Sequence, residues 1–301
     1  MKPSQHNKST AFQTITVITV SFAHLVHDTY TAFLPPLLPL LISKLSLNYS
    51  IAGVLSFFLR LPSLLNPFVG LLLDKLPFRY FIIATPFLTA LAMSMLGMAQ
   101  NMGALLLLLF VTGISSTFFH VPSPVMVKQV SGDRIGMGMS FYMLGGESAR
   151  MLGPLVILGA VSLWGLDGCW RLIFPGLAAS VILYFRLGHT KIIQEQKAPK
   201  DTVNHWQTLH KERSYFTALT GIFLMRSALK SALMIFLPTY LTARGESLWF
   251  GGLALSLLQL AGAGGTFMAG SLSDHIGRKT ALLISAGFSP VLVILFTVMS
   301  G

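Results

Sequence analysis

Long apolar stretches separated by short polar segments make up most of the chain from residue 14 onward. A stretch of about 20 apolar residues crosses a bilayer as an α-helix, and hydrocarbon tolerates only helices or closed barrels. Stretches this uniformly apolar indicate helices. We therefore predict an all-α membrane protein with about nine transmembrane helices, at residues 14–42, 50–73, 80–98, 103–127, 137–163, 168–187, 215–242, 249–273 and 280–300.

One polar and basic segment, residues 188–213, interrupts this pattern after the sixth predicted span. It is too short and too polar to be a folded domain. We expect an N-terminal six-helix bundle at residues 1–187, a cytoplasmic linker at 188–213, and three further helices at 214–301. Pro62 and Pro67 interrupt the second span, where backbone hydrogen bonds are lost and a helix bends.

The composition supports a membrane environment. Only 10% of the residues are charged and 53% are hydrophobic, whereas soluble domains carry about 25% charged residues. The single cysteine, Cys169, excludes a disulfide framework and a cysteine-based zinc site. The histidines lack the local spacing of zinc ligands, so no metal site is expected.

The net charge of +11 is spread over loops rather than gathered in one patch, which argues against a nucleic-acid partner. With the N-terminus placed in the cytoplasm, fourteen Lys and Arg residues lie in cytoplasmic segments and three in external loops. Cytoplasmic loops of membrane proteins are enriched in Lys and Arg. We therefore expect a multi-pass protein of the inner (plasma) membrane with a cytoplasmic N-terminus.

The chain contains an internal repeat. Leu38-Pro39 matches Leu237-Pro238, and Gly53 matches Gly252, at a common offset of 199 residues. Two parallel six-helix repeats are a known plan of secondary transporters. The second repeat has three helices before Gly301, so we expect the C-terminal half to be truncated.

The loop after the eighth span carries a motif typical of one transporter family. Residues 270–279 read GSLSDHIGRK, which resembles the signature loop of the major facilitator superfamily, and residues 70–79 are similar with Pro77 in place of the second glycine. The resemblance implies parallel six-helix repeats and a gating motif at a helix end, where an arginine pairs with the acid. The expected gating residues are Gly70, Asp74, Arg79, Gly270, Asp274, Gly277, Arg278 and Lys279.

Three further segments resemble the fosmidomycin-resistance branch of this superfamily, which contains drug exporters. They are residues 27–31 (HDTYT), 119–122 (FHVP) and 143–154 (MLGGESARMLGP). The resemblance implies efflux of a drug, and fosmidomycin is a phosphonate anion.

Ionisable residues inside predicted spans are the main functional clue, because each is costly within a bilayer. In the first span, His24, His27, Asp28 and Thr31 share one helical face, which should look into the bundle. A proton site is one interpretation, and a polar cluster that joins helices is the other. Glu147 and Arg150 are spaced to pair with each other.

The fixed cations outnumber the acids within the spans, which favours an anionic substrate. Arg226 and Lys230 lie one turn apart and need an acid from another helix or an anionic ligand. Arg60 pairs with Asp28 or lines the path, and His120 is a structural histidine or part of a proton path. We assign proton coupling to Asp28, His27, Glu147 and His24, and substrate binding to Arg226, Lys230, Arg150, Arg60 and His120.

Taken together, these patterns predict a monomeric proton-coupled secondary transporter that exports small organic anions or drugs by alternating access. The sequence contains no G-x-x-x-x-G-K-[ST] nucleotide loop and no soluble domain large enough for an enzyme. We expect no catalytic residues and no cofactor beyond the proton gradient. A ligand-binding membrane sensor and a transport-incompetent fragment are the alternatives.

Overall fold

The computed structural model describes residues 11–73, 77–190 and 210–299, with only part of the side chains toward the C-terminus. It divides into two compact units. The first comprises Met1–Gln194 with Ile235–Gln259, and the second Glu195–Met234 with Leu260–Gly301. The predicted linker lies largely outside the described residues, and the domain boundaries at 187 and 213 remain a prediction.

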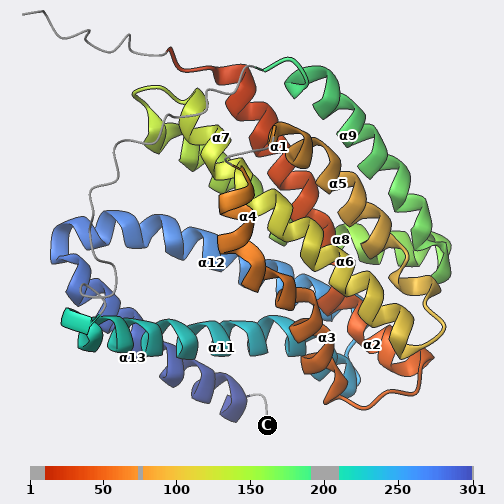
Figure 1. Cartoon of the computed structure of the whole chain (residues 1–301). Helices are drawn as coiled ribbons and strands as arrows, with labels where there is room; N and C mark the ends of the chain where they lie inside the picture. The colour runs from red at the N-terminus through yellow and green to blue at the C-terminus, as the bar shows by residue number, and fades with distance from the viewer. Residues whose placement is uncertain (1–10, 74–76, 191–209, 300–301) are drawn as a thin grey trace, which may run out of the picture. The chain divides into compact units, whose positions relative to one another are not determined.

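All regular structure in the described residues is helical (Figure 1). Before residue 191 the helices are α1 (Thr14–Thr31), α2 (Leu34–Lys44), α3 (Ile51–Arg60), η1 (Leu61–Leu65), α4 (Asn66–Leu73), α5 (Arg79–Ser94), η2 (Leu96–Met98), α6 (Met102–His120), α7 (Pro122–Val130), α8 (Ile135–Trp164), η3 (Asp167–Leu172) and α9 (Ile173–Leu187). After residue 209 they are α11 (Arg213–Ala243), α12 (Leu248–Ile276) and α13 (Arg278–Met299).

Eight helical segments in the described residues are long and apolar enough to cross a membrane. The first seven agree with the predicted spans to within three residues at each end. The eighth candidate covers Leu248–Gly265 of α12, and the predicted ninth span lies in α13, where the apolar stretch Lys279–Leu292 is shorter. Large apolar side chains such as Leu163 and Phe185, each 74% exposed, cover the surface of these helices. The chain is a multi-pass membrane protein.

Prolines divide three of the predicted spans into shorter helices. Proline near the start of a helix has the fixed backbone angle of a first turn but cannot donate a hydrogen bond to the preceding turn. The break between α1 and α2 therefore precedes Pro35, and the break between α6 and α7 precedes Pro122. The predicted interruption at Pro62 is confirmed as the 3₁₀ segment η1.

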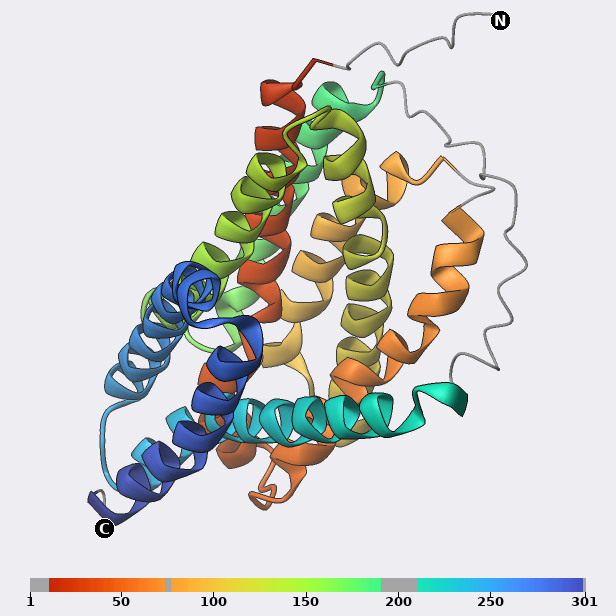
Figure 2. The same cartoon turned by 90° about the vertical axis from the view of Figure 1, so that its left-hand side faces the viewer.

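In the first unit, α1 packs against α8, α5 and α9, and α5 also packs against α6 (Figure 2). Two apolar clusters fill this unit. One contains Val20 and Ala23 of α1, and the other contains Tyr30 near the end of α1 and Phe33, which directly precedes α2. The polar residues of α1 lie between these clusters, near the middle of the span.

The connections of the first unit gather at two ends. At one end the backbone N–H of Gln13 donates to the carbonyl oxygen of Val130 at 2.9 Å, and Arg79 donates to the carbonyl oxygen of Thr190 at 2.8 Å. At the other end Lys44 donates to the carbonyl oxygen of Gly97 at 2.6 Å and to Asp167 at 2.5 Å. Successive connections therefore alternate between two ends, as a bundle that crosses a membrane requires.

Candidate functional site

The candidate site is built on α1, which carries three buried ionisable side chains. His24, His27 and Asp28 are exposed by 4%, 0% and 6%. Their burial agrees with the predicted orientation of this helical face toward the bundle interior. A carboxylate this far from water needs charged or hydrogen-bonding neighbours, so its contacts determine what the site can do.

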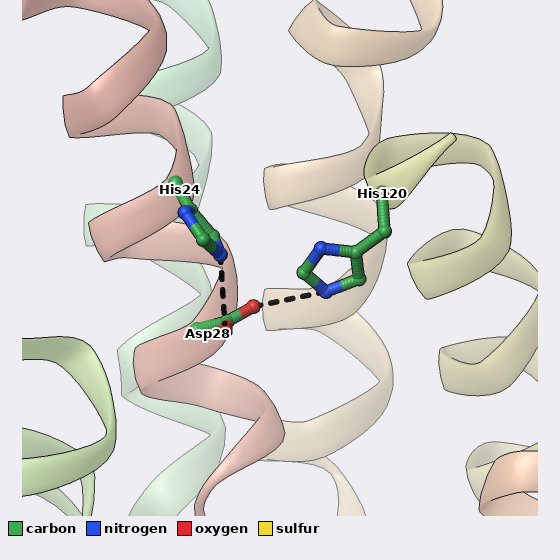
Figure 3. Close-up of side chains that lie close together, drawn as sticks. All are labelled: His24, Asp28 and His120. Carbon is green, nitrogen blue, oxygen red and sulfur yellow. Dashed lines mark ion pairs between the residues drawn. The ribbon is translucent and has the colours of Figure 1, made fainter. Parts of the chain in front are cut away.

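The carboxyl group of Asp28 lies between two imidazole rings (Figure 3). One oxygen is 3.2 Å from Nε2 of His24, one turn earlier on α1, and the other is 3.2 Å from Nε2 of His120, the last residue of α6. The His120 side chain is 39% exposed. The three residues therefore form a polar cluster with one accessible and one buried imidazole.

The tautomer of the neutral His24 ring follows from its other ring nitrogen. Nδ1 of His24 lies 2.8 Å from the carbonyl oxygen of Tyr142, and a carbonyl only accepts, so Nδ1 carries a hydrogen. In the neutral ring Nε2 is then a bare lone pair facing the Asp28 oxygen. A proton or another cation between Nε2 and that oxygen would remove the repulsion.

Helix α8 supplies both the space and the support for His24. The ring stacks on Tyr142 with centroids 4.0 Å apart, and it occupies space that a larger residue at Gly146 would fill. A Cβ atom at Gly146 would lie within 3.0 Å of three ring atoms of His24. The absence of a side chain at position 146 therefore lets the imidazole lie where it meets Asp28.

His27 belongs to a separate hydrogen-bond chain. The hydroxyl of Ser115 donates to the carbonyl oxygen of Thr85 at 3.0 Å, so Thr89 donates to Ser115 at 2.7 Å, and Nδ1 of His27 donates to Thr89 at 3.1 Å. Nε2 of His27 is buried and has no hydrogen-bond partner among the described residues. These contacts join α1 to α5 and α6, so His27 serves at least a structural purpose.

Glu147 and Arg150 form the predicted pair within α8. The guanidinium donates to the Glu147 carboxylate at 2.8 Å, and the two side chains are 21% and 28% exposed. Nε of Arg150 also donates to the carbonyl oxygen of Gly146 at 3.3 Å. Arg150 and His24 therefore both contact Gly146, Arg150 through a hydrogen bond and His24 through packing. Gly146 thus connects a predicted substrate-binding residue with a predicted proton-coupling residue.

The other predicted cations lie apart from this cluster or in the other unit. The ion-pair contacts of Asp28 go to two histidines, so the alternative that paired it with Arg60 is wrong, and Arg60 is exposed at the end of α3. Arg226 and Lys230 occupy exposed positions one turn apart on the part of α11 that belongs to the second unit. Their predicted role in substrate binding remains a prediction.

The predicted gating motif is described only in part. Asp74 lies outside the described residues, as do the side chains of Asp274 and Arg278. Gly277 has φ +84° between α12 and α13, a left-handed conformation in which glycine commonly ends a helix. Arg79, for its part, donates to the carbonyl oxygen of Thr190. Of the remaining motif residues, Gly70 lies within α4, Gly270 within α12, and Lys279 in the first turn of α13.

Sequence reasoning placed His120 with the substrate residues, whereas the structure places it beside Asp28. Its local signal was the sequence His120-Val121-Pro122, because Pro122 ends α6 and leaves His120 at the break. The role of the Tyr142 carbonyl as acceptor for His24 could not be predicted from the sequence, since every residue has a backbone carbonyl. A search for closely spaced zinc ligands in the sequence also misses the cluster of His24, Asp28 and His120, because its members lie on both α1 and α6.

The sequence matches the model of the Major Facilitator Superfamily over residues 20–301. The chain therefore belongs to the Major Facilitator Superfamily, a family of transporters rather than enzymes. The predicted resemblance, fold class and class of protein are confirmed. The chain is similar to the solved structure "Crystal Structure of A Bacterial Homolog to Human Lysosomal Transporter, Spinster, in Inward-facing And Unoccupied Conformation", with TM-score 0.68, 14% identity, and coverage of 89% of this chain and 64% of that chain.

Similar curated proteins carry resistance names. The Fosmidomycin resistance protein of Escherichia coli (strain K12) is 27% identical over 284 residues, which cover 92% of this chain and 69% of that protein. The Multidrug resistance protein MdtG of Serratia proteamaculans (strain 568) is 26% identical over 278 residues, covering 86% and 66%. The Uncharacterized MFS-type transporter YfnC of Bacillus subtilis (strain 168) is 27% identical, covering 89% and 67%. The chain thus spans about two thirds of the length of these relatives.

Proposed function

We propose that the protein is a proton-coupled exporter of small organic anions that works by alternating access in the inner (plasma) membrane, with its N-terminus in the cytoplasm. The observation that carries this proposal is the buried Asp28 carboxyl held between His24 and the half-exposed His120. Titratable residues inside membrane helices commonly mark proton relays. The names of the resistance relatives support export rather than uptake.

The proposed proton path begins at His120. Its partly exposed ring receives a proton and passes it to the Asp28 carboxyl, which shares it with Nε2 of His24. Protonation adds one positive charge to a largely buried site within the bundle. Proton binding shifts a transporter between its conformations when one conformation binds the proton more tightly than the other does.

Coupling to an anion is proposed to pass through Gly146. Arg150 donates to its carbonyl oxygen and also pairs with Glu147. A phosphonate competes with Glu147 for the guanidinium, since arginine binds such groups through two parallel hydrogen bonds. Movement of Arg150 toward the anion changes the backbone against which His24 packs, and this alters proton binding at Asp28. Arg226, Lys230 and Arg60 are proposed to add to the positive charge of the path.

The test is accumulation of labelled fosmidomycin, a phosphonate, in cells that express the protein, with and without a proton uncoupler. We expect the protein to lower accumulation and the uncoupler to restore it. Asp28→Asn preserves the size of the side chain and removes its charge, so uncoupler-sensitive exclusion should be lost. Asp133→Asn changes an exposed acid in the α7–α8 connection and should leave exclusion intact.

Each result has a distinct meaning. Uncoupler-sensitive exclusion that persists at the wild-type level in Asp28→Asn would remove Asp28 from the proton path. Equal accumulation with and without the wild-type protein would remove phosphonate export. Immunoblots of membrane fractions ensure that the variants are compared at equal amounts of protein.

A further inference from the structure

We propose that His24, Asp28 and His120 also form a binding site for a divalent transition-metal ion of the Zn²⁺ class. Each residue offers one ligand atom, and these atoms all lie within 4.8 Å of one another. Two imidazoles and one carboxylate are a common ligand set for such ions. A metal ion would be a second ligand of this cluster, with chemistry different from that of the proton.

The spacing of the ligand atoms fits a metal-centred arrangement. Zn²⁺ lies about 2.0–2.2 Å from nitrogen and oxygen ligands, so two ligands of a tetrahedral site are about 3.3 Å apart. Each of the two contacts between a histidine Nε2 and an Asp28 oxygen measures 3.2 Å. The two contacts involve different oxygens of one carboxyl group, which lies between the two rings (Figure 3), so all three side chains face a common position for an ion.

Two acceptor atoms of the cluster lack a hydrogen-bond donor, which also favours a bound cation. The Asp28 oxygen nearest His120 is buried and has no hydrogen-bond partner among the described residues, although Nε2 of His120 is 3.2 Å away. Nε2 of His24 is a bare lone pair in the neutral ring, because its Nδ1 hydrogen goes to Tyr142. A cation held by the carboxylate and the imidazoles satisfies both atoms simultaneously.

The surroundings of His24 resemble the outer shell of a metal site. Histidine ligands commonly donate their second ring N–H to a backbone carbonyl, which fixes the tautomer and the direction of the ring. His24 does so through Tyr142. His120 is 39% exposed, which leaves an entry for the ion and a position for water, as in three-ligand zinc sites that keep one position open.

The test uses the purified full-length chain with a streptavidin-binding tag, which avoids the metal affinity of a polyhistidine tag. Equilibrium dialysis against Zn²⁺ gives stoichiometry and affinity, and the visible absorption of bound Co²⁺ reports nitrogen and oxygen ligands. We expect one ion per chain. His24→Gln, Asp28→Asn and His120→Gln should each weaken binding by at least about 10- to 100-fold, the loss that follows when even an outer partner of a metal ligand is removed.

His189→Gln and His210→Gln are the matched controls, because both histidines are exposed and lie outside the cluster. They should leave the affinity unchanged. Binding that survives all three cluster variants, or that disappears in a control, would place the ion elsewhere and overturn the proposal, as would a wild-type protein that binds no Zn²⁺. His120→Gln replaces a partly exposed side chain and keeps the test valid if the buried variants do not fold. Because binding is measured without transport, this result is independent of the export proposal.

Discussion

At the scale of single residues, the cluster shows how a carboxylate is accommodated inside a membrane bundle. Burying an unpaired charge is costly, and here the partners are imidazoles rather than a fixed arginine. A guanidinium has donors and a permanent charge, whereas a neutral imidazole offers one donor and one acceptor nitrogen. The partners of Asp28 are two imidazoles, which, unlike a guanidinium, can therefore also accept a hydrogen bond or bind a cation.

Gly146→Ala is predicted to disable the cluster without changing any titratable group. Its Cβ would lie within 3.0 Å of three atoms of the His24 ring, and accommodating such overpacking costs about 1–3 kcal/mol. The ring should move away from Asp28, and uncoupler-sensitive exclusion of the phosphonate should fall to the level of Asp28→Asn.

Gly159→Ala is the control for this change, because it is on the same helix and a Cβ there has no neighbour within 4 Å. It should behave as wild type in the accumulation assay. Full activity of Gly146→Ala would show that the position of the His24 ring does not matter for transport.

The sequence predicted part of this site for a clear physical reason. His24, His27 and Asp28 lie close together in the chain, and helical periodicity alone places them on one face. The approach of His120 depends on how α6 packs against α1 and on where Pro122 ends α6. Such contacts between distant helices, and the donation of His24 to a backbone carbonyl, leave no periodic pattern in the sequence.

At the scale of helices, the contact between α1 and α8 depends on glycines of α8. A Cβ at Gly145 would strike the carbonyl oxygen of Ser21, and a Cβ at Gly153 would lie 2.6 Å from Cβ of Ala32 and 2.7 Å from the carbonyl oxygen of Thr29. Small residues at helix interfaces allow close backbone approach in membranes. The glycines at 145, 146 and 153 therefore set the distance at which α8 presents Tyr142 to His24.

Gly153→Leu is predicted to destabilise the protein by separating α1 and α8. Overpacking of a close interface costs about 1–3 kcal/mol, so the midpoint of thermal unfolding in detergent should decrease. The measurement is fluorescence-detected size exclusion after heating. Gly159→Leu, where an added Cβ has no neighbour within 4 Å, should unfold near the wild-type temperature, and equal melting of both variants would contradict this role of Gly153.

Helix boundaries were largely predictable, but the divisions within spans were less so. Hydrophobic length fixed the first seven spans because the bilayer imposes a minimum length. The apolar pattern continues through Ala32–Phe33 and through Val121, so it gave no sign that α1 ends before α2 or that α6 ends before α7. Pro35 and Pro122, which follow the two breaks, indicate where they occur. The predicted interruption at Pro62 rested on the same signal, but no break was predicted at these two prolines.

At the scale of the whole molecule, the connections of the first unit lie at two ends. The end with Gln13, Arg79 and Val130 also has Lys128 and Arg134 in or beside its α7–α8 connection, whereas the other end has Lys44 and Arg171. This asymmetry follows the enrichment of basic residues in cytoplasmic loops. It supports the proposed cytoplasmic N-terminus.

Cysteine labelling is predicted to distinguish the two ends. In a Cys169→Ala background, which removes the buried native thiol, Asn48→Cys lies in the exposed α2–α3 connection and Asp133→Cys in the exposed α7–α8 connection. A membrane-impermeant maleimide should label Asn48→Cys in intact cells and Asp133→Cys only after permeabilisation. The reverse pattern would invert the proposed orientation.

The space at Gly146 also has an evolutionary consequence. Any side chain at this position competes with the His24 ring for the same volume, so the two positions are constrained together rather than separately. Related transporters that keep histidine at position 24 should retain glycine at 146. Lineages that have lost the histidine are free to accept alanine or serine there, and this paired replacement would mark transporters that have abandoned the cluster around Asp28.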